Sequence, residues 1–426
     1  YDENYVPDEM IVMLKEGTDV NSFTSEFSDI NLVAKELLFE PYNIWLLKFD
    51  NNRVSSVDAL FRVKGSPEVS VAQFNHIIEQ RQQNIPNDTR FNEQWDMHNT
   101  GQSGGTPDAD IDGPEAWAIA TGGYTAQNDT VVCAVVDNGF FIAHQDLNFW
   151  KNTREIPGNG IDDDNNGYID DVDGWNAYNS NGTITSSQHG THVSGTVGAV
   201  GNNNQGVAGV NWNVKVMAVQ GSSGTEAVVV RAYGYVLKQK MLYLQTNGQR
   251  GAFVVSTNAS FGVDNGQPAN YPLWCGFYDS LGTWGILNAG AGPNANVNID
   301  VVGDIPTACP SDFMISVTNT TNTDVKNTGA GFGPINMDLG APGTNILSTN
   351  PSNAYGTSTG TSMATPHVTG AIGLMYAAAG PSFIALAKND PDSCARLFKH
   401  YIMTSVDTLA SLQTLVLSKG RLNLHK

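Results

Sequence analysis

The chain has few cysteines, few basic residues and no long apolar run. Its 4 cysteines among 426 residues are too few for a disulfide scaffold, and their spacing fits no zinc site. The 22 lysines and arginines face 42 aspartates and glutamates, which gives a formal net charge of -20. This charge disfavours nucleic acid and anionic membranes as partners and suits a protein that binds divalent cations. No apolar run approaches the length that crosses a bilayer, so we expect no membrane span.

The contexts of the cysteines and of the first residue bear on the compartment. Cys133 lies inside the apolar run VVCAVV, where a small buried hydrophobe is the simplest interpretation. Cys275 and Cys309 flank a glycine-rich region and would suit a disulfide in an oxidising compartment, a pairing that the sequence leaves open. The chain begins at Tyr1 rather than Met, so we expect that a signal peptide has been removed and that the protein is secreted or extracellular.

Length and composition predict two globular domains. With 40% hydrophobic residues, 15% charged residues and 44 glycines, the chain is typical of packed cores joined by many loops. Residues 1–80 contain elements in the order strand, helix, strand, helix, and they end on the apolar run VSVAQF. Residues 81–93 belong to a polar segment broken by Pro86, which we interpret as a linker. Residues 94–426 then form the larger domain.

Five continuous apolar runs follow the linker. They are VVCAVV before Asp137, VKVMAV from Val214, AFVVS from Ala252, GILNAG from Gly285 and FMISVT from Phe313. These runs alternate with helical stretches, which predicts an α/β fold with a mostly parallel sheet covered on both faces. In such folds ligands bind beyond the carboxyl ends of the strands, so residues directly after these runs are the first candidates for chemistry.

Three residues stand in contexts that suit nucleophilic catalysis. Asp137 follows a predicted buried strand and precedes a glycine turn, where a fixed and partly desolvated carboxylate is expected. His189 begins the segment HGTHVSGTVGAV, whose small residues permit close packing, and a histidine there exchanges protons near neutral pH. Ser362 stands in GTSMATPHVTG at the start of a long apolar helix, whose first turn offers unpaired backbone N–H groups.

Each of these residues alone has a simpler interpretation. An isolated Asp137 is typical of a turn, and an isolated Ser362 is typical of a helix N-cap. His189 and His192 would suit a metal on one helix face, but no carboxylate or third histidine accompanies them as a metalloprotease motif requires. The order aspartate, histidine, serine, with each residue in its own context, favours a catalytic triad.

The segments around these residues resemble the motifs of the subtilase family. VVDNG resembles its aspartate motif, HGTHVSG its histidine motif and GTSMATPHVTG its serine motif. The similarity extends to QWDMHNTGQ from Gln94, HQDL from His144 and GVAGV from Gly206, while Asn138 departs from the usual serine or threonine. The resemblance implies a subtilisin-like three-layer fold and a serine endopeptidase that hydrolyses polypeptides through an acyl-enzyme at Ser362.

The resemblance also implies roles for individual residues. His189 would accept the hydroxyl proton of Ser362, and Asp137 would orient the imidazole. The backbone N–H of Ser362 and an asparagine side chain would bind the oxyanion. The family's AGN reads AGPN in this chain, and we assign the asparagine to Asn294, with an ordinary loop residue as the alternative.

A further segment, NASFG, resembles the part of the family that pairs with extended substrates and lines the first specificity pocket. The residues assigned to substrate binding are Ser260, Phe261 and Gly262. Three other histidines are interpreted as structural because they lie beside glycine, proline or other turn residues. They are His98, His144 and His367.

An acidic loop predicts a structural calcium site. DDDNNGYIDDVD, from Asp162 to Asp173, alternates oxygen ligands around a glycine as an EF-hand loop does, with aspartate replacing the final glutamate. The candidate ligands are Asp162, Asp164, Asn166, the carbonyl of Tyr168, Asp170 and Asp173, with Asp171 as an alternative to either of the last two. A merely solvated acidic loop is the other interpretation. By the family resemblance, Asp146 and Asn203 would form a second Ca2+ site.

Residues 1–80 resemble subtilase pro-domains, which have a ferredoxin-like α+β fold, assist folding and inhibit by placing their tail in the active-site cleft. The resemblance implies a pro-form whose own pro-domain is an inhibitory partner and whose cleavage falls between His76 and Pro86. An unrelated binding domain is the alternative. For the whole chain, three other functions stay open: a silent subtilase that serves as a scaffold, an acyl-transferring ligase or macrocyclase, and a calcium-dependent adhesion module.

Overall fold

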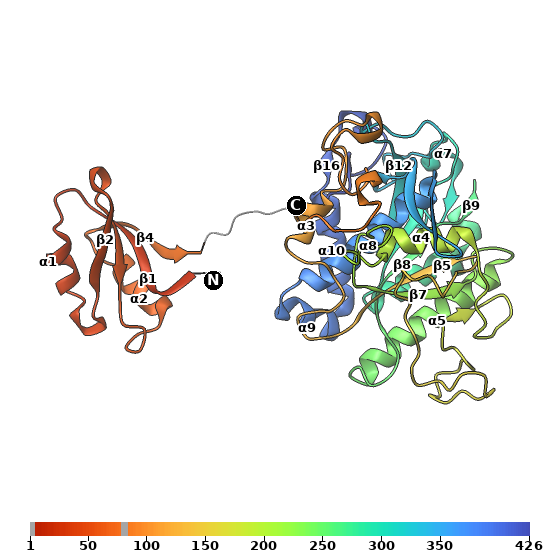
Figure 1. The fold of residues 1–426 in the computed structure, drawn as a ribbon, viewed down its shortest axis with the longest axis horizontal. Helices are drawn as coiled ribbons and strands as arrows, with labels where there is room; N and C mark the ends of the chain where they lie inside the picture. The colour runs from red at the N-terminus through yellow and green to blue at the C-terminus, as the bar shows by residue number, and fades with distance from the viewer. Residues whose placement is uncertain (1–4, 78–83) are drawn as a thin grey trace. The chain divides into compact units, whose positions relative to one another are not determined.

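The structure, a computed structural model, describes residues 5–77 and 84–426. The chain divides into two compact units, Tyr1–Arg81 and Gln82–Lys426, and each has its own hydrophobic core (Figure 1). Part of the expected cleavage region, residues 78–83, lies outside the described residues. Residues from Asn84 onward are bonded to the second unit, since the Asn84 N–H donates to the Pro114 carbonyl at 2.9 Å.

The first unit is a four-stranded antiparallel sheet with two helices. Its elements are β1 (Tyr5–Leu14), α1 (Val20–Ser25), β2 (Val33–Phe39), β3 (Ile44–Lys48), α2 (Ser56–Lys64) and β4 (Val69–His76). The strand order β2-β3-β1-β4 with this element order is the ferredoxin-like arrangement that the resemblance implied. Asp19 and Ser55 cap the two helices by accepting backbone N–H groups.

Strand β2 was not predicted from the sequence, because its side chains do not alternate between core and solvent. Instead, several large apolar side chains of this strand and of the turn after it are exposed. They are Val33, Leu37, Leu38, Phe39 and Tyr42. Contiguous apolar exposure of this kind is uncommon on a domain that has no partner.

The second unit is built on a nine-stranded sheet in the order β16-β17-β13-β12-β10-β8-β5-β7-β6. Neighbouring strands pair in parallel except β16 and β17. The strands are β5 (Val131–Asp137), β6 (Trp175–Asn176), β7 (Lys215–Gln220), β8 (Phe253–Ala259), β10 (Leu287–Ala291), β12 (Met314–Thr320), β13 (Leu339–Pro342), β16 (Asp407–Thr408) and β17 (Gly420–Arg421). The predicted α/β class with a mostly parallel sheet is confirmed.

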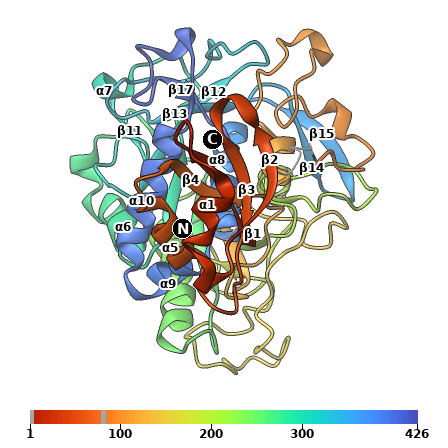
Figure 2. The same ribbon diagram turned by 90° about the vertical axis from the view of Figure 1, so that its left-hand side faces the viewer.

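Helices cover both faces of this sheet (Figures 1 and 2). They are α3 (Gly113–Trp117), α4 (Gln188–Gly198), α5 (Glu226–Gln245), α6 (Pro272–Thr283), α7 (Ile299–Val302), α8 (Thr361–Ala378), α9 (Pro381–Asn389) and α10 (Pro391–Thr404). Along β5, Val131, Cys133 and Val135 pack into the core that contains α4 and α8. Their neighbours Val132 and Val136 pack into the core on the opposite face, with α5 and α6. The continuous apolar run VVCAVV thus serves two cores, which makes three layers.

Two short antiparallel strand pairs lie outside the large sheet. β9 (Val263–Asp264) pairs with β11 (Asp304–Ile305), and β14 (Ile346–Asn350) pairs with β15 (Ala354–Ser358), both antiparallel. Among the described residues, no single helix has the length and apolar character needed to cross a bilayer. Helices α8 and α9 meet those criteria only as a pair, with a bend of 115° between them.

Candidate active site

Asp137 is the last residue of β5, at the carboxyl end of the parallel sheet. Its side chain is 1% exposed, and one carboxylate oxygen accepts the Asn138 N–H at 2.7 Å. The close approach of α4 depends on Gly190, because a Cβ on that residue would lie 2.9 Å from the Cβ of Asp137. The carboxylate is therefore fixed in a desolvated position under the first turn of α4.

His189 is the second residue of α4, and its Nδ1 lies 2.9 Å from each carboxylate oxygen of Asp137. Burial alone would lower the pKa of the imidazole, but the hydrogen bond and the charge of Asp137 outweigh burial and raise it. Because Nδ1 donates to Asp137, Nε2 is left to act as the base, and it has no hydrogen-bond partner among the described residues. The side chain is 36% exposed, so a substrate can reach it.

Ser362 is the second residue of α8. Its Oγ donates to the carbonyl oxygen of Ser260 at 3.2 Å, and no hydrogen bond joins it to His189 in the part of the chain that the structure describes. Hydrogen bonds between catalytic groups are often long before a substrate binds. Helix α8 packs directly against α4 and β8, so the nucleophile and the base lie on two contacting helices.

His192 holds these elements together rather than binding a metal. Its Nε2 donates to the carbonyl oxygens of Ile346 and Gly356 at 3.0 and 3.1 Å, which joins α4 to the β14–β15 hairpin. Burial lowers its pKa to about 4, so the imidazole is neutral near pH 7. The hairpin leads directly into the turn before Ser362, and the hydroxyl of Ser348 in β14 donates back to the His192 carbonyl at 2.7 Å.

Asn294 lies beside the first turn of α8. Its Oδ1 accepts the backbone N–H of Thr361 at 3.0 Å and the Thr361 hydroxyl at 3.1 Å. Its Nδ2 has no partner among the described residues, and the residue is exposed. The amide is thus anchored next to Ser362 with its donor group unoccupied, an orientation that suits oxyanion binding.

The predicted substrate segment follows β8. The hydroxyl of Ser260 donates to the Ser362 carbonyl at 2.9 Å, so the segment contacts the nucleophile directly. The ring of Phe261 stacks on Trp274 at 6.0 Å between centroids. Gly262 is required where it stands, because a Cβ there would lie 2.1 Å from the Ile305 carbonyl oxygen.

Comparisons with known proteins decide the family. Residues 128–418 match the Subtilase family. An extracellular protease of Xanthomonas campestris is 30% identical over 351 residues, which are 77% of this chain and 55% of that protein. Subtilisin E of Bacillus subtilis is 26% identical over 336 residues, 77% of this chain and 71% of that protein. A protease of known structure from Pseudoalteromonas arctica matches with a TM-score of 0.54 and 25% identity, over 80% of this chain and 97% of that one.

This chain belongs to the subtilase family. The resemblance inferred from the three motifs is confirmed, and the second unit contains a subtilisin-like serine protease domain. The chain spans about half the length of the Xanthomonas relative.

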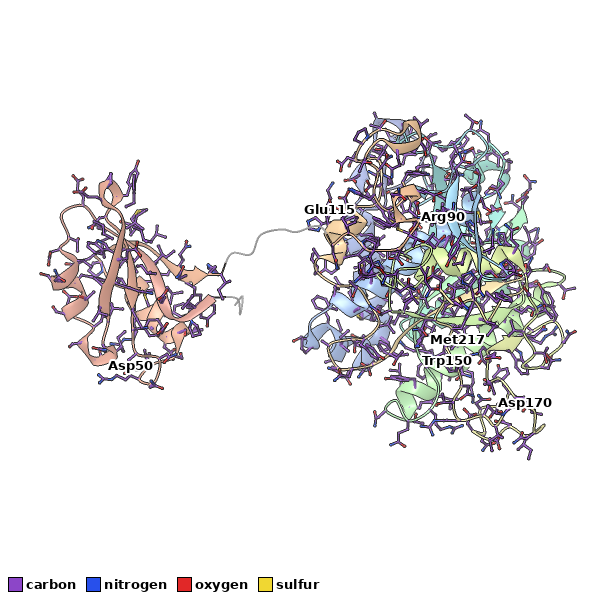
Figure 3. All side chains as sticks on the ribbon, in the orientation of Figure 1. Asp50, Arg90, Glu115, Trp150, Asp170 and Met217 are labelled. Atoms are coloured by element: carbon purple, nitrogen blue, oxygen red, sulfur yellow. A yellow bond between two sulfur atoms is a disulfide. The ribbon has the colours of Figure 1, made fainter. Side chains whose placement is uncertain are left out.

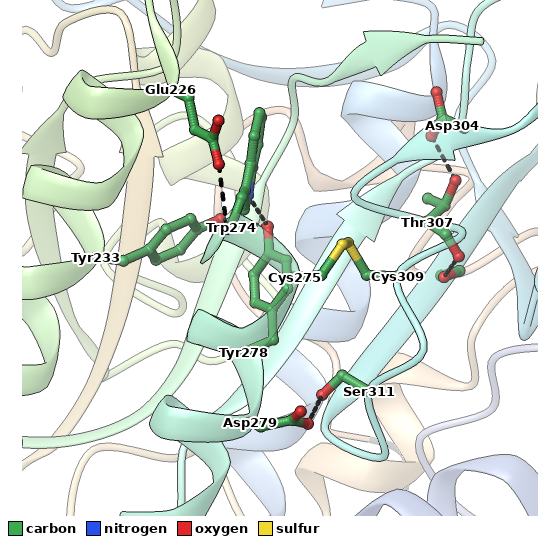
Figure 4. The surroundings of a disulfide bond; sticks show 11 residues. Glu226, Tyr233, Trp274, Cys275, Tyr278, Asp279, Asp304, Thr307, Cys309 and Ser311 are labelled. Carbon is green, nitrogen blue, oxygen red and sulfur yellow. Dashed lines mark hydrogen bonds between the residues drawn. A yellow bond between two sulfur atoms is a disulfide. The ribbon is translucent and has the colours of Figure 1, made fainter. Parts of the chain in front are cut away.

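A disulfide between Cys275 and Cys309 settles the pairing that the sequence left open. It joins α6 to the turn that follows β11, with a Cα–Cα distance of 5.2 Å (Figure 4). In the same turn, the hydroxyl of Thr307 donates to the buried carboxylate of Asp304. Cys133 and Cys394 are free and buried.

The acidic loop of this subtilase brings together three carboxylates, one of which the sequence analysis missed. Glu155, Asp162 and Asp164 offer oxygens that lie within 4.8 Å of one another. Asn166 belongs to the same turn, because its N–H donates to Asp162 and Asp164 at 2.9 and 3.0 Å. Three like charges this close repel one another unless a cation binds, and hard oxygen donors suit Ca2+.

The later residues of the loop lie differently. The carboxylate of Asp170, labelled in Figure 3, accepts the N–H groups of Asn159 and Gly160 at 3.2 and 3.1 Å. Asp173 forms an ion pair with Lys151. The structure does not bring these two carboxylates into the group around Glu155, and the ring of Tyr168 packs on aromatic neighbours.

Asp171 connects the loop to α5. It is fully buried, and it accepts the Tyr235 hydroxyl at 2.8 Å and the Gln239 amide at 3.1 Å. Burial raises the pKa of its carboxyl to about 6, although the hydrogen bond from the Tyr235 hydroxyl opposes the shift. The carboxylate of Asp171 is therefore hydrogen-bonded to side chains of α5, which lies beneath the acidic loop.

Asp146 and Asn203, the residues predicted for a second calcium site, lie beside a further carboxylate, that of Asp88. Asp146 is fully buried and accepts the Asn203 amide N–H at 2.6 Å, so the two residues are neighbours. Asp88 lies close enough for its pKa to be raised by burial and, to a lesser extent, by the charge of Asp146. One oxygen of Asp88 is buried without a hydrogen-bond partner. A pair of neighbouring buried carboxylates with an unsatisfied oxygen fits a divalent cation.

Proposed function

We propose that this chain is a secreted serine endopeptidase in which Asp137, His189 and Ser362 form the catalytic triad. The observation that carries the proposal is the Asp137–His189 pair at 2.9 Å, on a helix packed against the helix that begins with Ser362. An aspartate bonded to Nδ1 fixes the tautomer whose Nε2 accepts a proton, which is the requirement for activating a serine hydroxyl. The extracellular protease of Xanthomonas supports secretion.

The mechanism follows from these positions. Ser362 Oγ attacks the substrate carbonyl carbon, and its proton passes to His189 Nε2. The oxyanion binds the Ser362 N–H and the Nδ2 of Asn294. His189 then donates its proton to the leaving amine, which departs and leaves an acyl-enzyme. Water attacks this ester and gives a proton to His189, which returns it to Ser362 Oγ as the acyl C–O bond breaks and the acid leaves. Asp137 stabilises the imidazolium whenever His189 holds the second proton.

Labelling with a fluorophosphonate probe tests the nucleophile. We expect the wild-type protein to be labelled at Ser362 and to cleave a peptide library, and Ser362→Ala to lose both activities, with turnover reduced on the order of 10⁶-fold. Ser358→Ala, a change in the neighbouring strand β15, is the matched control and should be labelled normally. If wild-type protein folds but takes no label, a scaffold function becomes the better interpretation.

We further propose that residues 1–80 are the inhibitory pro-domain of this subtilase. The exposed apolar side chains on β2 support the proposal, because exposed apolar patches are a mark of protein interaction sites. We expect the chain to cut itself in the segment between His76 and Pro86 and to gain activity as it does so. Mass spectrometry of purified Ser362→Ala protein should show an intact chain; a cut at the same position in that variant would assign the cleavage to another protease.

Two sites for structural Ca2+ complete the proposal. Glu155, Asp162 and Asp164, with oxygens of the neighbouring loop, would hold one ion, and Asp88, Asp146 and Asn203 would hold the other. The fit rests on clustered carboxylates and on the unpartnered oxygen of Asp88. A bound cation neutralises these groups and stabilises the folded state, because it binds that state alone.

A further inference from the structure

A second aspartate–histidine pair lies in the interior of the larger unit. His367 of α8 and Asp96 are 0% and 1% exposed, and His367 Nε2 lies 3.0 Å from an oxygen of Asp96. His367 Nδ1 lies 2.9 Å from the carbonyl oxygen of Met363, one turn earlier in the same helix. From its place in the sequence His367 was expected to be structural, and Asp96 had no predicted role.

Proton counting fixes the chemistry of this pair. A carbonyl oxygen only accepts, so His367 Nδ1 must carry a hydrogen and donate it to Met363. One further proton is then shared between Nε2 and Asp96, either as imidazolium with carboxylate or as imidazole with carboxylic acid. Both forms keep the hydrogen bond and leave the pair neutral overall, which a buried site requires.

The pair acts on the turn that carries Ser362. Pro366 has no N–H group, so the Ser362 carbonyl lacks its usual helical partner and accepts the Ser260 hydroxyl instead. The Met363 carbonyl accepts a hydrogen bond from the His367 imidazole. The Thr361 carbonyl accepts one from the Thr365 hydroxyl at 2.9 Å. Side chains thus hold all three carbonyls around the nucleophile, and His367 is itself held by Asp96.

Asp96 is anchored independently of α8. The preceding Gln94 exchanges two hydrogen bonds with Ala208, both at 2.8 Å, and Trp95 donates its indole N–H to the Thr344 carbonyl at 3.1 Å. His192 of α4 is the titratable neighbour whose pKa the charge of Asp96 raises slightly, but burial dominates and leaves that imidazole neutral near pH 7. No lysine or arginine forms an ion pair with Asp96 among the described residues.

We propose that Asp96 is a positioning residue for the nucleophile. Through His367 it fixes the first turn of α8, so that the hydroxyl and the N–H of Ser362 are held in the orientation required for attack. This inference rests on the proposed role of Ser362. It adds a residue from outside the three family motifs to the machinery of the reaction.

Kinetics per active site test the proposal. Fluorophosphonate titration first counts the reactive Ser362 residues in the wild-type full chain and in each variant. Rates are then divided by this number, so that unfolded protein does not lower the measured kcat. Asp96→Ala should lower kcat about ten- to a hundred-fold and leave KM within about two-fold. Asp96→Asn, whose amide still donates to or accepts from Nε2, should restore kcat to within about three-fold of wild type.

Two comparisons separate positioning from general stability. Asp110→Ala removes another buried carboxylate of the same region, one that accepts the Asn99 and Asp112 N–H groups, and should lower the melting temperature without changing kcat per site. His367→Phe, which keeps the volume, should lower kcat as Asp96→Ala does, and the double variant should be no worse than either. If Asp96→Ala does not fold, His367→Phe carries the test.

An unchanged kcat per titrated site in Asp96→Ala or His367→Phe would overturn the positioning role. So would Asp96→Asn with a kcat as low as that of Asp96→Ala. Failure of the wild-type chain to take the label would instead contradict the proposed role of Ser362. The two results are therefore distinguishable.

Discussion

Ser260 and Ser362 are bonded to each other twice: each hydroxyl donates to the other residue's carbonyl oxygen, at 2.9 and 3.2 Å. The substrate segment and the nucleophile are therefore one hydrogen-bonded unit before any substrate binds. The second bond also sets the resting state, because the Ser362 hydroxyl points its proton at Ser260 rather than at His189. Attack requires rotation of that hydroxyl toward the imidazole.

Removing the Ser260 hydroxyl should slow the reaction and destabilise the helix start. Ser260→Ala leaves the Ser362 carbonyl without a donor, since Pro366 cannot supply one, and we expect kcat to fall about three- to ten-fold, the effect of one hydrogen bond of about 0.5–1.5 kcal/mol. Steady-state kinetics with titrated sites measure the effect. Ser280→Ala, which removes an exposed hydroxyl from α6, should match wild type; equal rates in both variants would mean that the bond has no role.

The dependence of rate on pH should follow the Asp137–His189 pair. His189 must be neutral to accept a proton, and its pKa lies above the ordinary value of 6.5 because Asp137 stabilises the imidazolium. The acid limb of kcat/KM is therefore expected above pH 6.5. Asp137→Asn removes that stabilisation while burial remains, so the limb should move to lower pH and the plateau should fall by roughly 10⁴-fold. A limb at the same pH in both proteins would show that another group controls it.

The sequence was most informative where functional residues lie in contiguous motifs. Asp137, His189 and Ser362 were identified because each lies in a motif of its own, and the continuous apolar runs predicted the parallel sheet. The very short strands β6, β16 and β17 were missed, since two residues carry no periodicity. Strand β2 was missed for a different reason: its side chains do not alternate between core and solvent, so its apolar residues carry no strand pattern.

Contacts between distant segments were not predictable in the same way. The Asp96–His367 bond joins residues 271 apart, and the Ser260–Ser362 bonds join residues 102 apart. Asp88 lies in the stretch that we interpreted as a linker, and its burial beside Asp146 could not be read from that polar segment. Glu155 precedes the acidic loop and has no place in the EF-hand spacing, which describes ligands within one loop only.

Asn294 should matter for turnover more than for binding. Its anchored Oδ1 leaves Nδ2 to stabilise charge that develops only during attack, so Asn294→Ala is expected to lower kcat by roughly 10²–10³-fold with little change in KM. Asn296, two residues further along the same loop, accepts a hydrogen bond from Lys326 and is a suitable control. Asn296→Ala with the larger loss of kcat would assign the oxyanion donor elsewhere.

Calcium should stabilise the protein through Glu155 rather than through the end of the acidic loop. At a Ca2+ concentration about 100 times the dissociation constant, binding adds about 2.7 kcal/mol to the free energy of unfolding, and chelation removes it. Melting temperatures are best measured on Ser362→Ala protein, because self-digestion then does not obscure unfolding.

Glu155→Gln and Asp162→Asn should each reduce the difference in melting temperature between calcium and chelator, since each removes a carboxylate from the cluster. Asp173→Asn is the matched control, because that carboxylate is already paired with Lys151. Glu155 also accepts the N–H groups of Asp164 and Asp170, and losing these bonds lowers the melting temperature with or without calcium. The difference between the two melting temperatures of one variant therefore reports calcium binding alone. If only Asp173→Asn reduces the calcium effect, the ion is bound by the ligands that the EF-hand spacing predicts and not by Glu155.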